Sequence, residues 1–165
     1  MRALALILLA TSAGAEGLDG LRLTMWIELR GEGGAILASA DPRAAVVGDG
    51  PEFGFDAADD DGGYRAVPAV VDVAGDRLTI GYGPDRAIEG GDRLGTFNGY
   101  VLTFAGAGCT TFEGGALVAE ETSIPMPPER VRIEADRIEI DVDGIPRGPG
   151  DRITVALSLG DCLLG

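Results

Sequence analysis

Histidine, lysine and glutamine are absent from this chain of 165 residues, and Asn98 is its single asparagine. Without histidine or lysine, the sequence excludes Ser-His-Asp and Cys-His nucleophile activation, histidine-ligated zinc or copper, phosphate binding by a P-loop lysine, and Schiff-base catalysis. Carboxylate chemistry, binding of hard cations, or no chemistry remains. We therefore expect a protein that is not an enzyme.

Positive charge is also scarce. Arginine supplies all 13 basic residues, and they face 27 aspartates and glutamates, which gives a formal net charge of −14. Such a surface repels nucleic acid and anionic lipid headgroups, so neither is an expected partner. The hydrophobic fraction of 45% argues against disorder. After the first residues no apolar run approaches the length of a membrane span, so we expect no span in the mature protein.

The first fifteen residues have the pattern of a secretory signal peptide. Arg2 supplies one positive charge, an apolar stretch runs from Ala3 to Ala10, and the small residues Ala13-Gly14-Ala15 precede a predicted cleavage site before Glu16. The apolar stretch is too short to anchor the chain in a bilayer. We expect residues 16–165 to form a single domain that is secreted or periplasmic, large enough to fold without metals or many crosslinks.

Two cysteines, Cys109 and Cys162, fit this oxidising destination. Paired, they close a loop of about 54 residues and stabilise the fold by roughly 4 kcal/mol in the chain-entropy model. The alternative is two buried, unpaired thiols. A catalytic thiol is not expected, because no histidine is present to lower its pKa.

Apolar side chains recur at every second position along most of the chain, which predicts strands with one buried face. The clearest expected strands are Leu21–Leu29, Val67–Val73, Arg77–Tyr82, Thr96–Phe104, Val131–Ala135, Ile138–Val142 and Ile153–Leu159. Shorter β-compatible pieces are Ala35–Ser39, Arg43–Val47, Glu52–Phe55 and Ala116–Ala119. Two pairs of them read as hairpins, at Val67–Tyr82 and Val131–Val142. Asn98-Gly99 indicates either another hairpin turn or a bulge within one long strand. Residues Cys109–Gly115 are expected to form a loop.

The glycines and prolines, 27 and 9 in number, punctuate these runs, and no segment sustains helical periodicity. The sequence therefore predicts an all-β fold, an antiparallel β-sandwich of about nine short strands, with a barrel as the alternative.

Three segments in fixed order carry a family resemblance: residues 46–53 (VVGDGPEF), 71–80 (VDVAGDRLTI) and 96–104 (TFNGYVLTF). This order resembles the secreted β-sandwich region of bacterial exosortase-sorted proteins of the PEP-CTERM type, over Ala44 to Leu159. The resemblance implies an association with the cell surface and exopolysaccharide, and no catalytic activity. The chain ends Asp161-Cys162-Leu163-Leu164-Gly165 without a Pro-Glu-Pro signal, so we expect the sorting function to be absent.

An acidic loop, Asp56 to Gly63, is the first candidate site. Its carboxylates Asp56, Asp59, Asp60 and Asp61 could contribute oxygen ligands to calcium, although their spacing matches no EF-hand. The alternative is a solvated acidic turn. If the loop binds calcium, the protein could act as a calcium-binding surface adhesin.

Trp26 is the second candidate. It is the only tryptophan and falls on the polar side of its strand, where an exposed ring could contact a carbohydrate. A glycosidase would need two carboxylates across a cleft, one with a raised pKa, and 27 acidic residues make a pair at that distance uninformative. The main expectation is a non-catalytic envelope or matrix protein whose partners are polysaccharide or envelope components, with exopolysaccharide binding and calcium-dependent adhesion as alternatives.

Overall fold

The computed structural model describes residues 18–54, 60–61, 64–65, 69–84, 87–105 and 111–160. The predicted leader and both cysteines lie outside these residues. Within them the chain forms thirteen strands and two 3-10 turns, η1 (Glu32–Gly34) and η2 (Pro128–Arg130). Among the described residues, no helix is long and apolar enough to cross a membrane.

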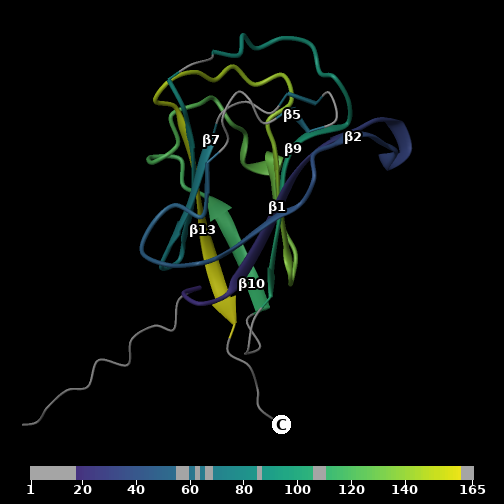
Figure 1. Cartoon of the computed structure of the whole chain (residues 1–165). Helices are drawn as coiled ribbons and strands as arrows, with labels where there is room; N and C mark the ends of the chain where they lie inside the picture. The colour runs from purple at the N-terminus through teal and green to yellow at the C-terminus, as the bar shows by residue number, and fades with distance from the viewer. Residues whose placement is uncertain are drawn as a thin grey trace, which may run out of the picture.

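The strands build two antiparallel sheets that face each other (Figure 1). Sheet A has the order β11-β12-β9-β1-β2, with β3 also paired to β1. Its strands are β1 (Arg22–Arg30), β2 (Ile36–Ser39), β3 (Arg43–Val46), β9 (Phe97–Ala105), β11 (Val131–Ile133) and β12 (Arg137–Asp141). Because the two sheets stay separate, the predicted β-sandwich is confirmed and the barrel alternative is wrong.

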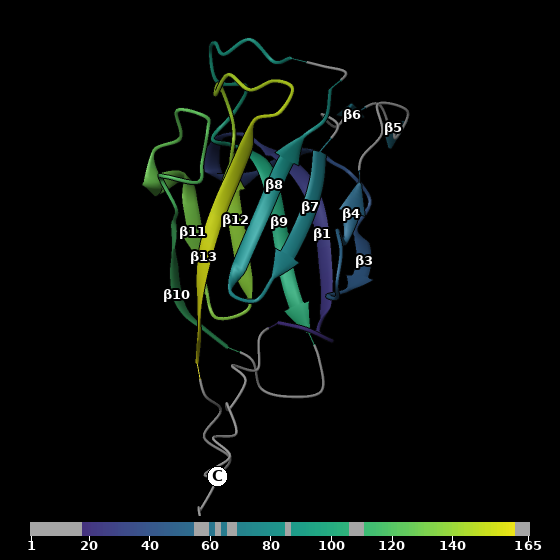
Figure 2. The ribbon, with the colours of Figure 1, turned by 90° about the vertical axis from the view of Figure 1, so that its left-hand side faces the viewer.

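Sheet B faces the viewer in Figure 2, with the order β10-β13-β8-β7-β4. Its strands are β4 (Phe53–Gly54), β7 (Ala69–Ala74), β8 (Arg77–Tyr82), β10 (Thr111–Leu117) and β13 (Arg152–Gly160). A separate ladder pairs β5 (Asp60–Asp61) with β6 (Tyr64–Arg65). The two 9-residue strands next to each other in sheet A, β1 and β9, pair along their whole length.

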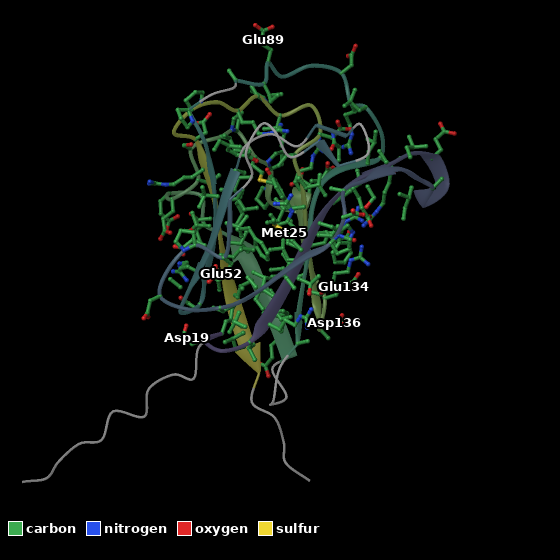
Figure 3. All side chains as sticks on the ribbon, viewed as in Figure 1. Asp19, Met25, Glu52, Glu89, Glu134 and Asp136 are labelled. Carbon is green, nitrogen blue, oxygen red and sulfur yellow. The ribbon has the colours of Figure 1, made fainter. Side chains whose placement is uncertain are left out.

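The core lies between the sheets, because alternate apolar side chains of every long strand point into this layer. Met25 sits at the centre of this layer, and Glu89 marks the far tip of the loops at one end (Figure 3). The fully buried side chains include Leu23, Met25, Val71, Val73, Leu78, Ile80, Leu102, Ile138, Ile140 and Ile153. Burial of such apolar surface is the main favourable term for folding.

Both predicted hairpins are confirmed. In the first, Val73 pairs with Leu78 and Ala74 with Arg77, so Gly75 and Asp76 form a two-residue turn. Gly75 has φ of 60°, the left-handed conformation that such turns require. In the second hairpin β11 pairs with β12. The described residues form thirteen strands, more than the predicted number of about nine, and nine of them are four residues or longer.

Asn98 and Gly99 lie inside β9, whose register against β1 is unbroken there, so the single long strand is confirmed, whereas the hairpin turn and the bulge are wrong. A side chain at position 99 would overlap the backbone carbonyl oxygen of Ile140 on β12. The glycine therefore serves the close approach of two strands rather than a turn.

The prediction of a loop at Cys109–Gly115 is wrong in its described part, because β10 begins at Thr111 and ends at Leu117. Glu113-Gly114-Gly115 reads as a turn in the sequence, but here it contains a register shift against β13. A side chain at Gly115 would overlap the carbonyl oxygen of Ala156 and the side chain of Ile133. Gly115 thus allows β10 to pack closely against β13 in its own sheet and against β11 of sheet A.

Candidate functional site

The outer face of sheet A carries charged side chains that belong to three neighbouring strands. Period two places Trp26, Glu28 and Arg30 of β1 on this face, opposite the core residues of the same strand. Trp26 is level with Val101 of β9, and Val101 is level with Glu139 of β12. Residues separated by more than one hundred positions therefore lie in one row across the sheet.

We define the charged cluster as Glu28, Arg30, Arg137 and Glu139. Arg30 lies at its centre: its Nη2 is 2.5 Å from Glu28 Oε2 and donates to Glu139 Oε1 at 2.9 Å. Arg137 Nη2 lies 2.7 Å from the same Glu139 oxygen. Both carboxylates are buried, with Glu28 at 6% and Glu139 at 9% exposure. The cluster is thus a nearly dry network in which two carboxylates share one guanidinium.

Aromatic rings extend this network. Trp26 donates its indole N–H to Glu28 Oε1 at 2.6 Å, and the Arg137 guanidinium lies 5.7 Å from the Trp26 ring centroid. On the other side, the Arg30 guanidinium lies 4.4 Å from the centroid of Phe97. Cations over aromatic faces are attracted by the ring quadrupole, more strongly where water is excluded. Trp26 is half-buried as a result, on the polar face that the sequence predicts.

The electrostatics of the cluster oppose acid catalysis. Burial by itself raises the pKa of Glu139, but the hydrogen bond and charge of Arg30, with the charges of Arg137 and Arg132, bring that pKa below its ordinary value of 4.5. The hydrogen bond from Arg30 to Glu139 likewise raises the pKa of Arg30 despite its desolvation. A carboxylic acid that donates a proton near neutral pH needs a raised pKa. Glu139 is held as a carboxylate instead.

A second polar network fixes the loops at the end of the sandwich that Glu89 marks in Figure 3. Asp141 Oδ2 accepts from Arg93 at 2.8 Å and from Arg130 at 2.5 Å. Asp143, which is 1% exposed, accepts the backbone N–H groups of Leu94 and Gly95, both at 3.0 Å. These bonds tie the polar segment before β9 to the end of β12, so both aspartates have a structural role.

The glutamate of the first family-like segment is also structural. Glu52 accepts the backbone N–H of Gly48 at 3.2 Å and that of Val73 at 2.8 Å through its two carboxylate oxygens. Its own N–H donates to the carbonyl oxygen of Val71 at 2.9 Å. Glu52 therefore joins the turn after β3 to the edge of β7. This segment crosses from β3 in sheet A to β4 in sheet B, and the hydrogen bonds of Glu52 fix the crossover.

A shallow apolar hollow of about 290 Å³ lies beside the end of β10. Leu117, Ile124, Met126 and the prolines Pro125 and Pro127 line most of it, with Ala119 and Thr122. Among the described residues no charged side chain lines this hollow, so none of them supplies an acid or a base there.

The calcium prediction falls largely outside the described residues. Asp56 and Asp59 lie outside them, and for Asp60 and Asp61 the structure gives the backbone of β5 alone. In the part of the chain that is described, no group of three or more Asp, Glu, Cys or His side chains could hold a metal ion. Calcium binding by the acidic loop stays a prediction.

The sequence pattern identified Trp26 as a candidate but none of the four residues of the charged cluster. Glu28 and Arg30 alternate with apolar residues, which indicates an outer face, but nothing local relates them to Glu139 at a separation of 109 residues from Arg30. The pairing of β1 and β12 on either side of β9 is what brings them together.

No protein-family model, curated protein or solved structure matches this chain. The resemblance to the sandwich region of exosortase-sorted proteins therefore stays a prediction from the three segments.

Proposed function

We propose that this chain is a secreted, non-catalytic β-sandwich protein of the cell envelope or extracellular matrix. The leader-like pattern of residues 1–15 supports export. The family-like segments support a surface location. Their described residues also have structural roles in the fold, as Glu52 and Gly99 do.

The observation that carries the non-catalytic part is the state of the charged cluster. Glu28 and Glu139 are two buried carboxylates on the outer face of sheet A, and both are bound to Arg30. The arginines lower the pKa of Glu139, the direction opposite to that of a general acid. A pair neutralised in this way stabilises and orders a surface instead of transferring protons.

Export is tested by expressing the full chain in a bacterium and determining the mass and first residue of the protein in the cytoplasm, periplasm and medium. We expect the mature chain to begin at Glu16 and to leave the cytoplasm. Leu8→Arg, which interrupts the apolar stretch, is the control and should remain unprocessed inside the cell. Wild-type protein that stays full-length in the cytoplasm would contradict the proposal.

A second candidate function, exopolysaccharide binding, is favoured by one observation: the half-buried Trp26 stands on the outer face of sheet A among polar groups. Ring faces with polar neighbours suit the apolar faces and hydroxyls of sugars. Because Trp26 is the only tryptophan, its fluorescence reports on this position alone. Titration with purified polysaccharides should shift its emission, and Trp26→Ala should abolish binding on a polysaccharide array.

The matched control is Leu94→Ala, since Leu94 is 68% exposed on a loop and lies outside the charged cluster. Binding that survives Trp26→Ala, or falls equally with Leu94→Ala, would remove Trp26 from the proposal. Failure to bind any polysaccharide would leave the structural role alone.

We also propose a Cys109–Cys162 disulfide. Thr111 pairs with Gly160 where β10 meets β13, and Cys109 precedes this pair by two residues while Cys162 follows it by two. A ladder continued by two residues on each strand would bring the two cysteines opposite one another, within reach of a disulfide.

A further inference from the structure

The edges of the two sheets are covered unequally. At one side, β10 and β11 lie against each other, and the N–H of Phe112 donates to the carbonyl oxygen of Ala135 at 3.0 Å. In sheet B the edge of β7 is covered by the short β4 and by the bonds from Glu52. In the described ranges nothing pairs with the outer edge of β2 or β3.

β2 and β3 together form one long edge. β2 pairs with the second half of β1 and β3 with its first half, both antiparallel, so residues 36–46 run along β1 with a register shift at Leu37 and an interruption at Ala40–Pro42. The N–H of Ala40 donates to Ile27 and that of Val47 to Leu21. Because bonded pairs alternate in an antiparallel ladder, the backbone groups of Ser39, Ala44 and Val46 face away from β1.

This edge is also unusually apolar. Ile36, Leu37 and Val46 are 61%, 60% and 66% exposed, and they are three of the five exposed large hydrophobic side chains among the described residues. An exposed edge strand with apolar side chains is a template for pairing with another strand.

The charge of the segment indicates which strand can pair with it. The chain carries a net charge of −14, yet residues 36–46 contain one acidic and one basic residue, Asp41 and Arg43, and are neutral. Two copies that approach through this edge avoid the repulsion present elsewhere on their surfaces. A two-fold axis near Asp41 and Pro42 also runs the two edges antiparallel and places Leu37 opposite the partner's Val46.

We propose that this edge is a homodimer interface, in which β2 of one copy pairs with β3 of its partner and the two A sheets join into one. The contact is the same on both copies, so it closes at two chains and forms no filament. This inference is independent of the proposed function, since it depends on the backbone and apolar side chains of the edge alone.

The test is the mass of the mature protein in solution, measured by sedimentation velocity over a concentration series. We expect a reversible dimer whose affinity rises with salt, because salt screens the repulsion between two acidic chains. Leu37→Lys and Val46→Lys should each weaken the dimer about tenfold or more, since charged residues on an edge oppose strand pairing.

Leu94→Lys is the matched control. It adds the same charge at an equally exposed leucine away from the edge, and should leave the dimer intact. Circular dichroism of each variant verifies that the sheets are retained. A single-chain mass at every concentration, species larger than two chains, or equal weakening by Leu94→Lys would each overturn the proposal.

Discussion

Replacement of Arg30 by methionine tests whether the charged cluster stabilises the fold. Methionine keeps the unbranched stem of arginine but removes the charge shared by Glu28 and Glu139. Glu139 retains Arg137 at 2.7 Å, so the loss falls mainly on Glu28, whose side chain is 8% exposed. Breaking a buried ion pair from one side costs about 3–5 kcal/mol, and the remaining Arg137 bond favours the lower end, about 3 kcal/mol.

A loss of about 3 kcal/mol is a large fraction of the about 5–15 kcal/mol that stabilises an ordinary domain. In urea unfolding followed by circular dichroism, it lowers the midpoint by about 1.5 M if the slope is about 2 kcal/mol per M. Arg77→Met is the control, because Arg77 and Asp76 form an exposed pair at 38% and 65% side-chain exposure. Such a pair contributes about 0–1 kcal/mol. Equal effects of the two substitutions would refute a stabilising role for the cluster.

The same variant has a distinct pH dependence. Since the pKa of Glu139 is lowered in the folded protein, its stabilising contribution is present above the ordinary pKa of 4.5 and is lost as pH falls below it. Arg30 is the main cause of the lowering, through its hydrogen bond and its charge. Between pH 6 and about pH 3 the Arg30→Met protein should therefore lose less stability than the wild type. Parallel losses would show that another group governs acid unfolding.

Four further predictions follow from individual sites. Gly99→Ala should cost about 3 kcal/mol or prevent folding, whereas Gly81→Ala, where no atom lies within 4 Å of the added carbon, should be neutral or stabilise by up to about 1 kcal/mol in urea unfolding. Glu52→Ala should cost about 1–2 kcal/mol, and Glu52→Gln less, because glutamine keeps an acceptor. The exported protein should contain no free thiol, and reduction of Cys109 and Cys162 should lower its stability by roughly 4 kcal/mol. Calcium at millimolar concentration should raise the melting midpoint relative to a chelator control if the acidic loop binds it.

The fold was predictable because the alternation of apolar and polar side chains within each strand identifies the face that the strand buries. Leu23 and Met25 alternate with Thr24 and Trp26, and this pattern alone assigns the core face of β1 and the outer face that carries the tryptophan. The same reasoning identified β7 and β8 around the turn at Gly75.

Local sequence patterns could not distinguish glycines in turns from glycines inside strands. In Asn98-Gly99 and in Gly114-Gly115 the sequence contains signals typical of turns, yet both pairs lie inside strands. The approach of a second strand, β12 at Gly99 and β13 at Gly115, leaves no room for a side chain at these two glycines, whereas Gly114 has open space around it. Only the arrangement of distant strands distinguishes this use of glycine from a turn.

The charged cluster likewise depends on the arrangement of distant strands. It also shows that the net charge of the sequence does not describe where the charges lie on the surface. Arg30, Arg93, Arg130, Arg137 and Arg147 are engaged in ion pairs, in bonds to backbone carbonyls or over aromatic rings. Their charge is used to neutralise carboxylates such as Glu139 and to hold loops. Many of the remaining acidic side chains, including Asp19, Glu89, Glu134 and Asp136, lie at the periphery of the sandwich (Figure 3). Over the described surface, the electrostatic potential is therefore dominated by carboxylates that no arginine neutralises. This favours neutral or cationic partners, and among polysaccharides it disfavours those rich in uronic acids.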